Sequence, residues 1–259
     1  ACRLRCRAER RAFLEGKEDD ILRIGYAAGT ATHQADFAVA ASALRRVLEK
    51  HPHVRLVLFN TVDISEMDAL SGMEQAIEWR DTVPLEDLPR ELARFDINII
   101  PLETDNVFCH CKSELKFFEA ALAGVPSVAS PTRPFCDAIR DGENGFLAEG
   151  PREWEEKLEC LVRDAALRGR MGGAALRSVL WRFGPEYLRH GAAAVVEYVL
   201  GDAARRSRVF ASEALCLQRD GERGGEAIAV PDYEVVFSSG PGSARVAVVI
   251  PLYNYETYV

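Results

Sequence analysis

The sequence lacks several features that would place it in a familiar class. It has no apolar run of about eighteen residues, so it predicts no membrane-spanning helix. Its N-terminus is rich in arginine but has no apolar core of the kind that a signal peptide needs. The P-loop pattern G-x-x-x-x-G-K-[ST] is absent. The loop GYAAGTATHQ also fails the G-x-G-x-x-G spacing that a nicotinamide-dependent oxidoreductase requires.

The sequence also has no net positive charge and no pair of cysteines at C-x-x-C spacing. The formal net charge of −8 argues against a nucleic-acid partner. Seven cysteines, an odd number with no C-x-x-C pair, predict a reducing, cytoplasmic location. Cys109-His110-Cys111 offers two thiols and an imidazole, but adjacent positions in one loop rarely complete a zinc site without a distant second pair. We therefore expect no metal.

Arginines gather in two places, Arg3–Arg11 and Arg205–Arg208. Runs of charge are usually solvated, so we interpret both as exposed arms or linkers. A peripheral contact with an anionic membrane at its inner face is the second hypothesis for them.

Apolar runs of strand length alternate with segments of helical periodicity. Val54–Phe59 is apolar at every position except Arg55, as a strand buried on both faces would largely be, and Ala35–Lys50 has apolar residues at helical spacing. This alternation predicts an α/β fold with a Rossmann-like parallel sheet and helices on both faces. Further strands are expected at Ile21–Tyr26, Ala76–Trp79, Ile97–Pro101, Ser127–Ser130 and Asn144–Leu147, and further helices at Leu85–Arg94, Pro151–Asp164 and Ala166–Trp181.

The segment KSELKFFEAALAGVPSVAS, from Lys112 to Ser130, predicts a helix followed by a buried strand. Ser113 is a natural N-cap, because its hydroxyl can accept a hydrogen bond from the first turn. Gly124 ends the helix and Pro126 blocks its continuation. The start of this helix is therefore a candidate anion site, since its free N–H groups and its dipole favour negative charge.

Three charged residues add to this candidate site. Lys112 and Lys116 are one helical turn apart, and Glu119 follows three residues later, so the three side chains are predicted to share one helix face. A phosphate near the lysines and a sugar diol near the carboxylate would both be accommodated. This is the chemistry of a site for a nucleotide-diphosphate sugar.

The region from about Ile24 to Tyr187 resembles the donor-binding domain of retaining glycosyltransferases with the B-type two-Rossmann fold, the large family 4 in particular. The resemblance is carried by IGYAAGTATHQADF, FDINIIPLE, KSELKFFEAALAGVPSVAS and IRDGENGFLAEGPREWEEKLECLVRD. It implies that Glu119 binds the ribose hydroxyls, a role that suits a carboxylate facing two hydroxyl donors. It also implies that this domain is one half of a two-domain enzyme.

Two positions depart from the family pattern. The family often has a glutamate eight residues before Glu119, where this chain has Cys111. The family's arginine–lysine pair after the first strand is also missing, since the loop here is AGTATHQADF. We expect Lys112 and Lys116 to supply the positive charge instead.

Ligands of open parallel sheets bind beyond the carboxyl ends of the strands. Gly29 and Thr30 follow the first expected strand, where glycine would let the backbone approach a ligand closely, with a plain tight turn as the equal alternative. Arg80 and Val83 follow the third, where family members bind the base through backbone groups. No catalytic residue is assigned. The predicted nucleotide-sugar site consists of Gly29, Thr30, Arg80, Val83, Lys112, Ser113, Lys116 and Glu119.

The segment RVAVVIPLYNYETYV resembles the opening strand of an A-type, family-2 glycosyltransferase, with a strand added to the first domain as the alternative. We therefore expect a fragment of a tandem glycosyltransferase. Its predicted parts are a charged arm at 1–20, the Rossmann-like nucleotide-sugar-binding domain at 21–184, a C-terminal helix at 185–200, a linker at 201–245 and the truncated start of a second transferase domain at 246–259.

The expected function is transfer of a sugar, with retention, from a nucleotide-diphosphate sugar to a glycan or lipid-linked acceptor, in surface polysaccharide synthesis and without a cofactor. The isolated chain is expected to bind nucleotide but to turn over little without its acceptor domain. One alternative is a non-catalytic nucleotide-binding or scaffolding module derived from such an enzyme. A sugar-nucleotide epimerase that shares the two-domain fold is another.

Overall fold

The computed structural model of the protein describes residues 2–17, 19–28, 34–60, 62–64, 67–182 and 184. The first compact unit of the chain comprises Ala1–Gly184, and all of the described residues belong to it. The expected helix 185–200, linker 201–245 and tail 246–259 lie outside the described residues.

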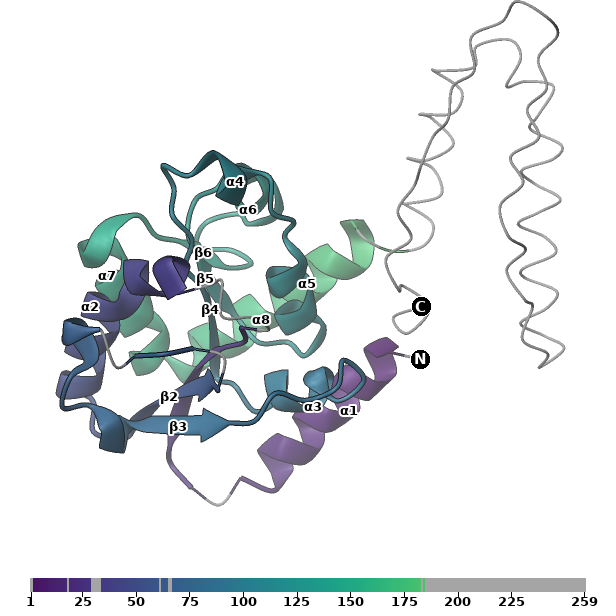
Figure 1. Cartoon of the computed structure of the whole chain (residues 1–259). Coiled ribbons are helices and arrows are strands. Elements are labelled where there is room, and N and C mark those ends of the chain that lie inside the picture. The colour runs from purple at the N-terminus through teal and green to yellow at the C-terminus, as the bar shows by residue number, and fades with distance from the viewer. Residues whose placement is uncertain are drawn as a thin grey trace, which may run out of the picture. The chain divides into compact units, whose positions relative to one another are not determined.

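One sheet of six parallel strands lies at the centre of the first unit (Figure 1). The strand order is β3-β2-β1-β4-β5-β6, which is the order of the doubly wound Rossmann fold. This confirms the predicted fold class. The strands are β1 (Leu22–Tyr26), β2 (Val54–Phe59), β3 (Ile77–Arg80), β4 (Ile97–Ile100), β5 (Ser127–Ala129) and β6 (Phe146–Leu147).

Alternate residues of the strands enter two apolar layers, one on each face of the sheet. In β2, Leu56 and Leu58 pack into one layer, while Val57 and Phe59 pack into the other. The helices α2 (Gln34–Lys50) and α7 (Gly150–Arg163) pack together over the first layer (Figure 1). The helices α1 (Cys2–Glu15), α3 (Leu88–Leu92) and α5 (Leu115–Leu122) lie over the second.

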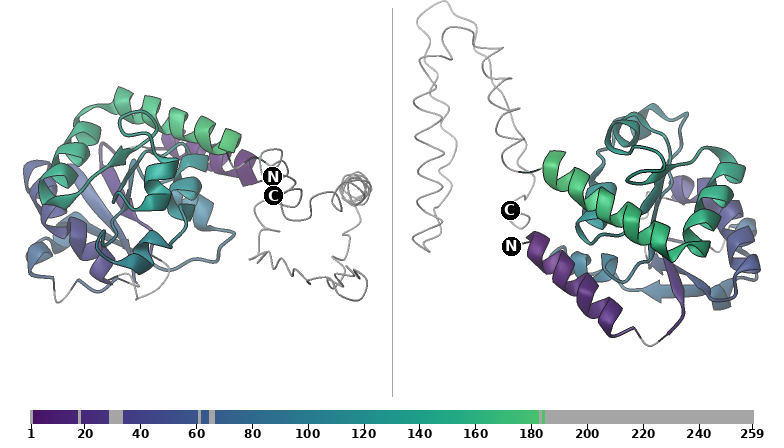
Figure 2. Two further views of the ribbon diagram at one scale, coloured as in Figure 1. Left: turned by 90° about the horizontal axis from the view of Figure 1, so that it is seen from above. Right: turned by 180° about the vertical axis from the view of Figure 1, so that it is seen from behind.

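Helix α8 (Ala165–Arg182) connects the two layers. Its Met171 belongs to the layer beneath α7, and its Ala175 and Val179 belong to the layer beneath α5. Figure 2 shows α8 from behind as a long helix that runs across the domain. This helix therefore joins both faces of the fold.

The segment predicted as a charged arm forms helix α1 instead. Arg10 of this helix donates to the backbone oxygens of Ala93 at 2.8 Å and Phe95 at 2.7 Å, and to the carboxylate of Asp96 at 3.4 Å. The arginine content alone suggested a solvated segment, but one of these arginines caps backbone groups of the loop before β4. Residues 2–15 are thus part of the domain.

Two short helices and two 3₁₀ turns were not predicted from the sequence. They are α4 (Val107–His110), α6 (Arg133–Ala138), η2 (Asp68–Leu70) and η3 (Glu74–Ala76). Segments of three to six residues are too short to show a helical period, which explains why pattern analysis misses them. None of the helices in the described part of the chain is long and apolar enough to cross a bilayer.

Candidate functional site

The carboxyl ends of β1 and β4 meet at the centre of the sheet. These two strands are neighbours, and the strand order reverses between them. In doubly wound folds this reversal opens the crevice in which ligands bind. The segments that follow β1 and β4 lead to α2 on one side and to α4 and α5 on the other. The charged residues of the predicted motif therefore lie at this switch point.

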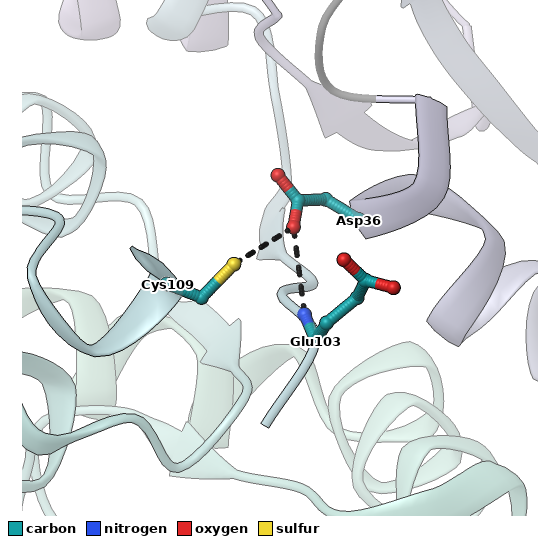
Figure 3. Close-up of side chains that lie close together, drawn as sticks. All are labelled: Asp36, Glu103 and Cys109. Carbon is teal, nitrogen blue, oxygen red and sulfur yellow. Dashed lines mark hydrogen bonds between the residues drawn. The ribbon is translucent and has the colours of Figure 1, made fainter. Parts of the chain in front are cut away.

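Asp36 is the central charged residue of the switch point. It lies in the first turn of α2 and is 3% exposed. One carboxylate oxygen accepts from the ammonium of Lys112 at 2.6 Å. The other accepts from the thiol of Cys109 at 3.3 Å and from the backbone N–H of Glu103 at 3.4 Å (Figure 3). The helix N-terminus adds to the stabilisation of this buried negative charge.

Asp36 contributes to a raised pKa in both Lys112 and Cys109, which leaves the lysine charged and the thiol neutral. Partial burial lowers the pKa of Lys112, but the hydrogen bond and charge of Asp36 outweigh it, so the pKa lies above its ordinary value. Burial, together with Asp36, raises the pKa of Cys109, so its sulfur stays a thiol at neutral pH. The cluster is therefore an ion pair, Asp36–Lys112, with a neutral thiol beside it.

The same cluster is the place where the described residues come nearest to a metal site. Ligand atoms of Asp36, Glu103 and Cys109 lie within 4.8 Å of one another. The ammonium of Lys112 already neutralises Asp36. In this structure the cluster is an ion-pair network in which Asp36 is paired with Lys112. The side chains of the Cys109-His110-Cys111 motif diverge, since Cys109 is buried, Cys111 is exposed and His110 contacts the backbone oxygen of Thr104.

Lys116 is more deeply buried than Lys112. Its ammonium is buried, and it has no hydrogen-bond partner among the described residues. It lies 4.6 Å from the centroid of the Tyr26 ring, over the end of β1. Burial lowers the pKa of Lys116 to about 8, while the charges of Asp36 and Glu119 act in the opposite direction. An amine in this state has donors to offer to an anion.

Tyr26 itself is a second polar group in this position. Its hydroxyl is buried and has no hydrogen-bond partner in the described part of the chain. Its ring stacks on Phe37 at a centroid distance of 5.0 Å. Burial raises the pKa of Tyr26, so the phenol is neutral and keeps its O–H donor. Lys116 and Tyr26 thus each have a buried donor with no hydrogen-bond partner among the described residues, close to the carboxyl end of β1.

Helix α5 begins later than the sequence predicts. Its N-cap is Glu114 and its first residue is Leu115, whereas Ser113 is exposed and lies before the helix. The expected N-cap at Ser113 is therefore wrong. The reason is the ion pair with Asp36, which holds Lys112 in the turn between α4 and α5 rather than on the helix. The expected shared helix face is correspondingly wrong for Lys112, while Lys116 and Glu119 both lie in α5.

The other end of α5 follows the prediction. Gly124 has a φ of +73°, and Val125 N–H donates to the carbonyl of Ala120 at 3.0 Å while Gly124 N–H donates to Ala121 at 2.9 Å. This is a Schellman motif, which glycine adopts without steric cost. The backbone then turns directly into β5.

The remaining predicted residues lie elsewhere or outside the described part. Arg80 ends β3, and its guanidinium donates to Glu78 at 2.9 Å. Val83 is half-buried in the loop that follows. Gly29 and Thr30 lie outside the described residues. The structure thus brings together Lys112, Lys116 and Glu119 of the predicted set, and the other positions stay predictions.

Sequence reasoning missed Asp36 and Tyr26. The signal for Asp36 was a single acidic residue in the first turn of a helix that follows the first strand. The signal for Tyr26 was an aromatic residue at the carboxyl end of a buried strand. Neither signal is distinctive, because first-turn acids and strand aromatics are common in proteins without any ligand.

A surface groove of about 350 Å³ lies away from this site. It is lined by Arg7, Arg10, Leu14, Ala123 and Leu176, from α1, α8 and the C-terminal end of α5. The charged cluster lies at the opposite end of α5, so the groove is not part of the candidate site.

Comparison with known proteins adds independent information. Residues 21–164 match the family model described as "Glycosyl transferases group 1". D-inositol 3-phosphate glycosyltransferase of Arthrobacter sp. is 29% identical over 115 residues, which are 44% of this chain and 26% of that protein. Its counterpart from Corynebacterium diphtheriae is 29% identical over 141 residues, 54% of this chain and 30% of that protein.

A solved structure shares the fold. The crystal structure of Anabaena Alr3699/HepE in complex with UDP is 16% identical, has a TM-score of 0.55, and is matched over 74% of this chain and 53% of its own. The chain spans 26% and 30% of the length of the two curated relatives.

Proposed function

Because the chain belongs to the group 1 glycosyl transferases, we propose that it is the donor-binding half of such an enzyme. It binds a nucleotide-diphosphate sugar at the switch point, in the crevice beyond β1 and β4. The sugar then passes to a glycan or lipid-linked acceptor with retention at the anomeric carbon. We also propose that the enzyme is a member of family 4 and that it acts in surface polysaccharide synthesis.

The observation that carries the proposal is the buried ammonium of Lys116. A buried cation without a hydrogen-bond partner is costly, and proteins retain such groups mainly where a ligand completes them. Here the group lies among Lys112, Glu119 and Tyr26 at the place where this fold binds nucleotides. A diphosphate would supply the missing acceptors.

The charges at the site match the reaction. When the glycosidic bond to the donor breaks, negative charge develops on the departing diphosphate. Lys116 and Lys112 are cations fixed in a largely water-excluded crevice, where they stabilise such charge strongly. Glu119 lies further along α5, and we propose that it accepts hydrogen bonds from the ribose hydroxyls. The lysines supply the charge for which other transferases use a metal, so we propose that neither a metal nor a cofactor takes part.

We propose that the residues that bind the acceptor, and the general base, lie outside the described residues. The tail at 246–259 lies outside them too, and its assignment as the start of a second transferase domain stays a proposal. The same holds for a cytoplasmic location and for a peripheral contact of the arginine-rich segments with the inner face of a membrane.

Calorimetric titration of the 259-residue chain with UDP, GDP and dTDP tests the proposal. UDP is the first choice because a structural relative is known in complex with it. We expect saturable binding of one nucleotide, weakened at least about tenfold, or ~1.4 kcal/mol, by Glu119→Ala. A well-folded chain that binds none of the three would overturn the donor-site assignment and favour the non-catalytic module.

A further inference from the structure

The carboxylate of Asp36 joins segments that are far apart in the sequence. It belongs to α2, yet its partners Glu103, Cys109 and Lys112 lie in the segment between β4 and α5. That segment follows the carboxyl end of β4, at the switch point. Asp36 therefore connects α2 to the segment that carries Lys112.

The two lysines of the site differ in their relation to this carboxylate. Lys112 is paired with Asp36 directly, at 2.6 Å. Lys116 has no hydrogen-bond partner in the described part of the chain, but the charge of Asp36 acts on it and favours its protonated form. One buried carboxylate thus influences both cations.

We propose that Asp36 is a positioning residue that holds Lys112 at the mouth of the crevice and keeps Lys116 charged, so that both lysines meet the bound anion as cations. The inference rests on the proposed function for the identity of that anion, a diphosphate. Asp36 itself touches no substrate in this arrangement.

Among the described residues, Tyr26, Asp36, Lys112 and Glu119 act on the charge of Lys116. Burial over the neutral ring of Tyr26, from β1, disfavours the ammonium, and the nearby cation of Lys112 disfavours it further. Asp36 from α2 and Glu119 from α5 favour it. Removal of Asp36 therefore shifts the balance toward the neutral amine, and removal of Lys112 shifts it the other way.

The first test is titration of the chain with UDP over a range from about pH 7 to about pH 10. Wild-type affinity should fall as the pH rises through about 8, where Lys116 loses its proton. In Asp36→Asn the affinity should be at least about tenfold weaker near pH 8, and its midpoint should lie at lower pH. The amide keeps the size of the side chain but not its charge.

Asp96 provides the matched control. It is also a buried carboxylate, 5% exposed, and it accepts from Lys17 at 2.9 Å and Arg10 at 3.4 Å. It lies just before β4, at the amino ends of the strands and so on the side of the sheet opposite the candidate site. Asp96→Asn should cost stability while it leaves the pH midpoint of UDP binding unchanged.

A second test needs no nucleotide. The side-chain carbons of the lysines are labelled, and the Lys116 signal is identified by its loss in Lys116→Arg. Its titration midpoint, followed by NMR, should move down in Asp36→Asn and up in Lys112→Met. A general disturbance of the fold would not move the midpoint in opposite directions.

The outcomes separate the inference from the proposed function. Opposite shifts together with UDP binding support both. Opposite shifts in a chain that binds no nucleotide support the role of Asp36 but overturn the diphosphate as the anion. A Lys116 midpoint that stays unchanged in Asp36→Asn would overturn the inference, whether or not UDP binds.

Discussion

The side-chain nitrogen of Lys116 lies 4.6 Å from the centroid of the Tyr26 ring, buried at the carboxyl end of the central strand. A cation over an aromatic face gains some electrostatic stabilisation, on the order of 1 kcal/mol. Ammonium donors that have no hydrogen-bond partner in the described part of the chain cost more than this. The arrangement lowers stability at the site of proposed binding, as functional groups often do.

Replacement of Lys116 by methionine should therefore stabilise the domain and abolish nucleotide binding. A tenfold change in proton affinity is worth about 1.4 kcal/mol, and the pKa of Lys116 falls from 10.5 to about 8. Allowing for partial solvent contact, we expect a gain of roughly 1 to 3 kcal/mol in the free energy of unfolding at neutral pH. Urea unfolding and calorimetry measure the two effects.

The gain in the free energy of unfolding from Lys116→Met should be largest below about pH 8 and should shrink as the pH rises. Below about pH 8 the folded wild-type chain carries the buried charge, so the full gain is present. Between about 8 and 10.5 the unfolded chain binds more protons than the folded one, wild-type stability rises with pH, and the gain shrinks. Lys157→Met is the control, because Lys157 also lies 4.6 Å from a ring centroid, that of Phe146, but pairs with Asp141. A similar gain in this control would contradict the explanation.

Glu119→Gln should weaken nucleotide binding by about tenfold or more, since an amide replaces a charged acceptor of two hydroxyl donors. It should reduce binding of a nucleoside diphosphate far more than binding of inorganic diphosphate, which has no ribose. Glu156→Gln, at an exposed position of α7, should change neither. Equal losses for both ligands would show that Glu119 acts on the phosphates or on the fold instead.

Gly172→Ala should destabilise the domain by roughly 1 to 3 kcal/mol or more. A Cβ atom at this position of α8 would lie 1.9 Å from the backbone oxygen of Gly124, so α8 and the end of α5 would have to separate. Gly169→Ala, in the same helix with nothing within 4 Å of its Cβ, should instead add about 0.5–1 kcal/mol through helix propensity. Thermal unfolding of both variants distinguishes close packing from a general intolerance of α8.

Arg10→Met should cost roughly 2–3 kcal/mol, because it removes charge-assisted hydrogen bonds to the backbone of Ala93 and Phe95 and leaves Asp96 with one cation fewer. Arg11→Met should cost less than about 0.5 kcal/mol, because its pair with Glu15 is exposed. Denaturant titration of the two variants tests whether α1 belongs to the folded domain. Equal, small effects would restore the interpretation of this segment as a solvated arm.

Local pattern predicted most of the elements of the domain. Strand β2 has the predicted bounds, Val54–Phe59, since a short run that is apolar except at Arg55 and lies between polar turns suits a strand with both faces covered. The end of α5 at Gly124 was also predicted, because the positive φ of that position suits glycine. These features depend on residues that are close in sequence.

Features that depend on distant residues were not predictable in this way. The start of α5 was misplaced because Lys112 is drawn to a partner 76 residues earlier, and helix propensity contains no information about that partner. The role of α1 was missed for the same reason, since Arg10 contacts a loop more than eighty residues later. The amino-acid composition shows the positive charge of α1 but not the contacts that Arg10 makes.

The sequence by itself determined the parallel α/β fold and the motif at α5, because hydrophobic period and glycine position act over a few residues. The family resemblance added the proposed donor-site roles of Lys116 and Glu119. Only the tertiary structure decided that Asp36 pairs with Lys112 and that Lys116 is buried over Tyr26. The reversal of strand order between β1 and β4 brings these residues together. Burial and charge are properties of that shared environment, and no single segment of the chain contains it.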